Sequence, residues 1–143
     1  MALIAQDLVQ QVMDTYKANK DRPQQMQSTY LALTDAVDAL EQCGLRKDAL
    51  AVLDGVLSRI AILFPSELRA RAFLRIAQLT PELRLAANYF ERSIAIQPLP
   101  EAYLGLAGVY RDLHDNTHAN RYEVRARAAE AAWSKICGEP QQV

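Results

Sequence analysis

The side chains best suited to metal chemistry are two histidines in the second half of the chain. His114 and His118 are four residues apart with Asp115 between them, so two ring nitrogens and a carboxylate could reach one ion. The sequence His-Asp-Asn-Thr at 114–117 is also typical of a turn between helices, and a break there prevents one helical face from presenting both rings. We therefore expect turn and capping roles for these residues, with no bound metal and no cofactor.

No catalytic motif accompanies them. The chain contains no glycine-rich phosphate loop, no paired-histidine zinc helix and no Gly-x-Ser-x-Gly elbow. Cys43 and Cys137 are far apart and fit neither a metal-ligand spacing nor a disulfide framework. We expect a buried Cys43 that packs as a small apolar group and an exposed Cys137. The sequence predicts a protein that is not an enzyme, with a small helical enzyme or metal protein as a remote alternative.

The composition of the chain gives no indication of a nucleic-acid or membrane partner. The chain has 143 residues, enough for one domain with its own core. Sixteen basic and seventeen acidic side chains give a net charge of −1, so no overall field draws it to nucleic acid or an anionic membrane. No run approaches the roughly 20 apolar residues of a membrane span, and no basic, apolar leader is evident. We expect a cytoplasmic protein with no nucleic-acid or membrane partner.

Prolines, glycines and capping residues divide the chain into helices. We expect seven, at about 3–18, 26–44, 46–63, 67–79, 81–96, 100–113 and 117–136, with a turn at Gly44 and an end at Gly138. The first helix carries its apolar stripe at Ile4, Leu8, Val12 and Tyr16. Thr80 is expected to cap the fifth helix, and Asn116 or Thr117 the last.

Small and aromatic residues recur in these helices at a regular spacing. Ala86, Phe90, Ser93 and Pro98 are followed by Tyr103, Leu106, Ala107 and Tyr110. Small residues early in every second helix, at Ala49, Ala86 and Ala119, lie 37 and 33 residues apart. A small residue there lets two helices approach closely. Gly105 and Gly108 are expected to serve either close helix packing or a bare groove surface.

These patterns resemble the tetratricopeptide repeat (TPR), whose period is 34 residues. The resemblance implies an all-α fold in which antiparallel helix pairs stack as a short right-handed superhelix. It implies one domain over 1–143: a helix and linker at 1–23, helix pairs at 28–64, 66–98 and 100–136, and a tail at 137–143. In the last pair, Glu123 stands where the family places an aromatic residue, which predicts a shifted packing face for the final helix.

The resemblance also implies a concave surface formed by the first helix of each pair. Its expected members are Asp38, Glu41, Arg71, Arg75, Leu104, Gly108, Arg111 and Asp112. Arg71 and Arg75 are one helical turn apart, and with Arg111 they could hold a carboxylate by bidentate hydrogen bonds. The alternative is a solvated charged face in which Arg75 pairs with nearby acids.

Such surfaces predict a protein–protein interaction module, an adaptor, scaffold or chaperone-like protein, that binds a peptide or helix of its partner. The first helix, outside the three pairs, could cap the stack or form a homodimer. An oligomerising structural segment of a larger repeat assembly is the alternative. Trp133 is expected to anchor the last helix against the sixth, or to cover the end of the stack.

Overall fold

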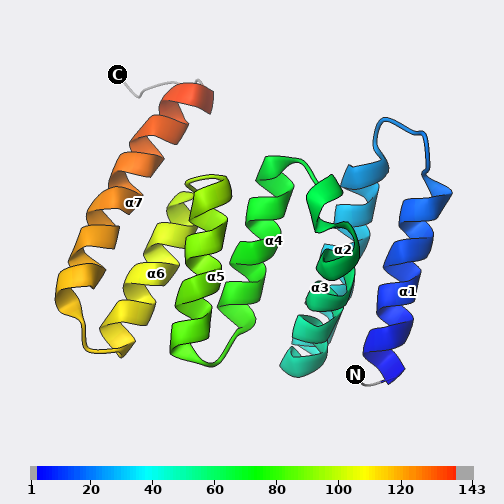
Figure 1. The fold of residues 1–143 in the computed structure, drawn as a ribbon, viewed down its shortest axis with the longest axis horizontal. Coiled ribbons are helices and arrows are strands. Elements are labelled where there is room, and N and C mark those ends of the chain that lie inside the picture. The colour runs from blue at the N-terminus through cyan, green and yellow to red at the C-terminus, as the bar shows by residue number, and fades with distance from the viewer. Residues whose placement is uncertain (1–2, 138–143) are drawn as a thin grey trace. The chain divides into compact units, whose positions relative to one another are not determined.

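The computed structural model describes residues 3–137, and this part of the chain is all-α. It contains seven α-helices, one 3₁₀ helix and no strand within the described range (Figure 1). In chain order these are α1 (Leu3–Ala18), α2 (Gln25–Gln42), α3 (Arg46–Ile60), η1 (Ala61–Leu63), α4 (Ser66–Leu79), α5 (Leu83–Ile96), α6 (Pro100–Asp112) and α7 (Asn116–Cys137). The seven predicted helices are confirmed. The expected helix end at Gly138 and the tail that follows it lie outside the described residues.

The chain divides inside α4, between Ala72 and Phe73, into two compact units. The first unit contains α1, α2, α3, η1 and the first half of α4. The second contains the rest of α4 with α5, α6 and α7. The arrangement of all helices as three stacked pairs stays a prediction.

The core of the first unit is aliphatic. Helices α1, α2 and α3 each contact the other two. Their buried side chains include Ala5, Val9, Val12, Leu33, Val37, Val52, Leu53 and Val56. The predicted inner stripe of α1 is wrong in part, because Ile4 is 54% exposed while Ala5 is fully buried. The small side chain of Ala5 lets α1 lie close to its neighbours, which larger Ile4 would prevent.

Two helices end with the same left-handed turn. Gly44 after α2 has φ 75°, and His114 after α6 has φ 61°. In each case the N–H of the next residue donates to the carbonyl five residues earlier, at 2.8 Å. This pattern satisfies carbonyl groups that would otherwise lack a partner at the helix end. The turn roles predicted for Gly44 and His114 are confirmed.

The start of α5 corrects one predicted cap. Thr80 does not cap α5: its hydroxyl donates to the carbonyl of Ile76 at 2.7 Å, one turn back in α4. The cap is Glu82, whose carboxylate accepts from the N–H groups of Arg84 and Leu85 at 3.1 and 2.7 Å. Because α5 begins at Leu83, two residues later than expected, the Thr80 hydroxyl serves the preceding helix instead.

In the second unit α5 and α6 meet at a glycine. Phe90 of α5 is only 4% exposed. A Cβ atom placed on Gly105 of α6 would lie 2.3 Å from Cε1 of the Phe90 ring. Gly105 is therefore used for close helix packing, whereas a Cβ on Gly108 would meet no atom within 4 Å. The close packing expected for this pair occurs at Gly105, and a groove at Gly108 stays a prediction.

Candidate functional site

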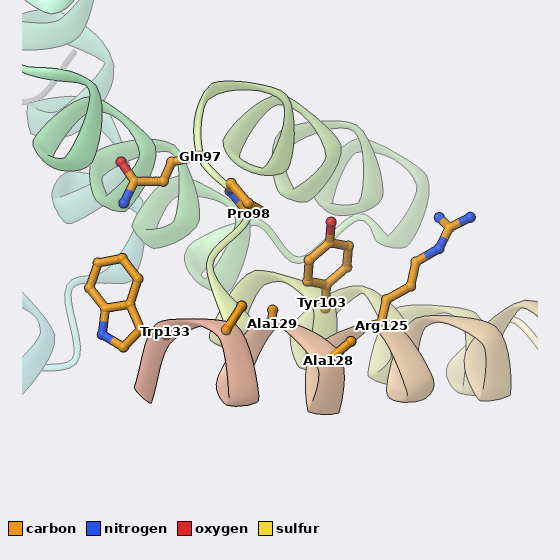
Figure 2. Close-up of a pocket in the computed structure, with 8 residues that line it drawn as sticks. Gln97, Pro98, Tyr103, Arg125, Ala128, Ala129 and Trp133 are labelled. Carbon is orange, nitrogen blue, oxygen red and sulfur yellow. The ribbon is translucent and has the colours of Figure 1, made fainter. Parts of the chain in front are cut away.

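An apolar pocket of about 520 Å³ lies in the second unit, beside the C-terminal half of α7. Its walls come from the α5–α6 loop, α6 and α7, through Gln97, Pro98, Tyr103, Arg125, Ala128, Ala129, Ala132 and Trp133. Figure 2 shows Trp133 at one end and Arg125 at the other, with Pro98 and the alanines between them. The volume lies in the range of ligand-binding pockets, about 300–1,000 Å³.

The pocket exists because α7 is longer than the helix it packs against. Helix α7 has 22 residues and α6 has 13. At 1.5 Å per residue the lengths are about 33 and 20 Å, so α7 extends past the start of α6. Among the described side chains of α7, none beyond Ala126 is buried. The extension is rich in alanine, the strongest helix former, which favours the helix even where no neighbour covers it.

Aromatic rings fix the N-terminal half of α7 to α6. Tyr110 of α6 stacks on Tyr122 and His118 of α7, with centroid distances of 5.5 and 5.0 Å. Tyr103 of α6 stacks on the other side of this group, 6.4 Å from Tyr122. Burial, together with the nearby carboxylate of Glu91, raises the pKa of the Tyr110 hydroxyl. These contacts hold α7 in one position and so fix the pocket wall.

The face of α7 that packs against α6 includes Tyr122, next to Glu123, and a shift of this face from the TPR register stays a prediction. Tyr122, rather than residue 123, supplies the aromatic contact. Glu123 forms an ion pair with Arg111 of α6, and Val124 is 64% exposed. The packing face also determines which residues of α7 turn toward the pocket.

The pocket-facing residues of α7 form one helical stripe. Arg125, Ala128, Ala129, Ala132 and Trp133 follow the spacing i, i+3, i+4, i+7 and i+8, which places all five on one side of the helix. Three small residues lie between a cation and a large aromatic ring. The stripe therefore presents a shallow apolar surface with a positive end and an aromatic end.

Among the described residues, Arg125 is the only charged side chain that lines the pocket. Its guanidinium carbon lies 5.3 Å from the centroid of the Tyr122 ring, a cation–π contact. Among the described residues no carboxylate forms an ion pair with Arg125. Its charge thus remains available to an incoming anion.

The four predicted site residues on α2 and α4 already interact with other residues of this chain. Arg71 lies 3.5 Å from Glu67 one turn earlier on α4, and Arg75 also has a partner. Asp38 is exposed and Glu41 half-buried on α2, and neither lacks a partner. Their role in binding stays a prediction.

The four predicted site residues on α6 have different surroundings. Leu104 is 49% exposed, and Gly108 one turn further leaves an open notch in the helix surface. Arg111 pairs with Glu123, and Asp112 is exposed at the helix end. The arginine is thus engaged inside its own unit. Contact of this surface with a partner also stays a prediction.

Asp115 and His118, from the predicted histidine cluster, stabilise the start of α7. The Asp115 carboxylate accepts from the backbone N–H of His118 at 3.2 Å and lies 2.6 Å from Nδ1 of the same residue. The backbone hydrogen bond, and then the side-chain bond, lower the pKa of Asp115. The predicted caps Asn116 and Thr117 are therefore wrong, because Asp115 is already positioned by the left-handed turn at His114. In the described range no group of three or more potential ligands could hold a metal ion.

The predicted environment of Cys43 is wrong. Cys43 is exposed, because it is the C-terminal cap of α2 and lies beside the turn at Gly44. The side chain of Cys137 lies outside the described residues.

Sequence reasoning missed the pocket, although two signals pointed to it. The predicted last helix was longer than the predicted sixth helix. It also has three alanines on the same helical face as Trp133. A helix covered by neighbours along its whole length would have larger apolar residues on that face. Trp133 itself is half-buried at the end of the pocket.

The comparisons with known proteins give no relative. No family model, curated protein or solved structure matches this chain. None of the helices within residues 3–137 is long and apolar enough to cross a membrane.

Proposed function

We propose that this chain is a cytoplasmic protein–protein interaction module built from TPR-like helix pairs, without catalytic activity of its own. Its binding site is the pocket beside α7, and its ligand is a peptide or helix of a partner protein. The observation that carries the proposal is the apolar stripe of α7, which no other described helix covers.

The packing of α5 and α6 supports the TPR-like part of the proposal. Five of the eight motif residues, Ala86, Phe90, Ser93, Leu106 and Ala107, are buried. The motif thus serves helix packing, as it does in the family it resembles. Pro98 and Tyr103, which are not buried, line the pocket instead.

The environment of the arginines favours the α7 pocket over the surface predicted from the sequence. Arg71 and Arg111 each have a carboxylate neighbour, so a ligand carboxylate would have to displace it. Arg125 has none among the described residues, and it lies next to apolar surface that a partner side chain can bury. Burial of apolar area beside a charged hydrogen bond is a common combination at binding hot spots.

Selection of peptides tests the function. Phage-displayed random peptides would be selected against the full chain, and the selected sequences titrated while Trp133 fluorescence is followed. Trp133 is the only tryptophan, so a change in its emission reports on the pocket. We expect selected peptides to change the emission and to lose affinity when Ala129→Gln narrows the pocket.

The matched control is Ala131→Gln. Ala131 is exposed on the same helix and does not line the pocket, so the substitution costs the same helix propensity but leaves the site open. Peptides that bind both variants equally would contradict the site. If Arg71→Glu with Arg75→Glu abolished their binding instead, the surface predicted from the sequence would be the correct one.

A further inference from the structure

The two ends of the α7 stripe define what can occupy the pocket, and this inference rests on the proposed function. Trp133 offers a flat apolar surface at one end, while Arg125, beside Tyr103, offers a cation without a carboxylate partner in the described chain at the other (Figure 2). Within the part of the chain that the structure describes, no acidic side chain lines the pocket. A ligand that fits both ends carries a carboxylate and a large apolar group.

The distance between the ends sets the spacing of these groups. Arg125 and Trp133 are eight residues apart on one helical face, which is about 12 Å along the axis at 1.5 Å per residue. The residues between them on that face are alanines, so a second helix can lie close against α7. A helix packed along the stripe spans the same distance in seven or eight residues.

An extended peptide fits this surface less well. Backbone groups in the middle of α7 are hydrogen-bonded within the helix, so α7 offers no free edge to which a strand could add. A helical ligand has its own backbone groups satisfied and needs only side-chain contacts. The surface therefore matches the helix-in-groove mode of recognition.

We infer that the pocket binds an amphipathic helix of a partner protein, with an Asp or Glu seven or eight residues from a large apolar residue. The carboxylate pairs with Arg125, and the apolar side chain lies between Trp133 and Pro98. Small or apolar residues one turn apart fill the space over the three alanines.

Paired synthetic peptides test this inference. Each peptide is a helix with one large apolar residue and one test residue at the stated spacing, made in both sequence directions, with the test residue either Glu or Lys. Affinities are read from Trp133 fluorescence for the wild type, for Arg125→Glu and for the control Arg127→Glu. Arg127 is exposed on α7 and does not line the pocket.

We expect the wild type to bind the Glu peptide about tenfold more tightly than the Lys peptide, as for a charge pair beside apolar surface. Arg125→Glu should reverse this preference, and Arg127→Glu should leave it in place. The preference should shrink as salt screens the charges.

Four other results would overturn the inference, and each has a distinct meaning. Equal affinity for both peptides removes the acidic requirement but leaves the proposed function. If neither designed peptide binds while phage-selected peptides do, the spacing of the two groups on the helical ligand is wrong and the proposed function stands. If neither the designed nor the phage-selected peptides change the Trp133 emission, the proposed function fails as well. If light scattering shows that the chain self-associates and Ala129→Gln makes it monomeric, a second copy occupies the pocket.

Discussion

Two glycines of α6 allow a sharp test of the packing in the second unit. Gly105 and Gly108 lie three residues apart on the same helix, so substitution by alanine changes the intrinsic helix propensity by the same amount. Their surroundings differ, because Gly105 faces Phe90 and Gly108 faces open space. We predict that Gly105→Ala destabilises the unit and that Gly108→Ala stabilises it.

The magnitude follows from the contact distances. A Cβ on Gly105 would lie 2.3 and 2.5 Å from two atoms of the Phe90 ring, whereas carbon atoms in contact prefer about 3.5–4.0 Å. The ring is 4% exposed, so it has little room to move, and overpacking of this kind costs about 1–3 kcal/mol. Alanine gains about 1 kcal/mol through helix propensity, so the net loss of stability is up to about 2 kcal/mol. Gly108→Ala meets no atom and should gain about 0.5–1 kcal/mol.

Urea unfolding is the suitable assay. Circular dichroism follows the helices, and Trp133 fluorescence follows the second unit, which contains both glycines. We expect the two variants to differ by about 2 kcal/mol in free energy of unfolding, with opposite signs relative to the wild type. If Gly105→Ala proved as stable as Gly108→Ala, the close approach of α5 and α6 would be wrong.

A double substitution identifies the contact partner. Phe90→Leu removes the ring atoms nearest to the added methyl group, so Gly105→Ala should cost less in that background than in the wild type. Strict additivity of the two substitutions would mean that the methyl group meets some other atom.

Three further predictions concern helix ends of the second unit. Glu82→Ala removes the acceptor for two backbone N–H groups of α5 and should cost about 1 kcal/mol in urea unfolding, while Glu82→Gln keeps an acceptor and should cost less. His114→Gly relieves a left-handed conformation that side chains disfavour and should raise the free energy of unfolding by about 0.5–1 kcal/mol, a gain that His114→Ala should not give. Because the pKa of Asp115 is lowered in the folded state, its contribution to stability is present above its ordinary pKa of 3.8 and is lost as pH falls through the lowered value. Asp115→Asn should therefore remove part of the loss of stability in acid, as measured by melting curves at a series of pH values.

The end of α2 and the start of α6 were predictable because local chemistry determines them. Gly44 adopts the left-handed conformation that ends α2, and Pro100 occupies the first position of α6, where no amide donor is needed. Both effects act within a few residues and leave a plain signal in the sequence. The same locality explains why the turn at His114 could be expected from the polar residues around it.

The orientation of helices was harder to predict because it depends on contacts between distant residues. In α1 both the stripe through Ile4 and the stripe through Ala5 are apolar enough to face a core. The structure buries Ala5, Val9 and Met13, and the small side chain of Ala5 allows the helices to meet closely. Periodicity alone favours the larger side chains, and it therefore predicts a buried face rotated by about one residue from the face that the structure buries.

The α7 pocket depends on a difference between two helix lengths rather than on any single motif. Pro98 and Pro100 separate α5 from α6 and fix where α6 begins, while the alanines of α7 favour helix well beyond that point. The extension carries a tryptophan beside small residues, a composition that suits contact with another helix better than contact with water. Binding is therefore expected at the place where the helix pair is unequal in length. Shortening α7 from its C-terminal side to remove Trp133 should abolish peptide binding and leave the stacked tyrosines that join α6 to α7 intact.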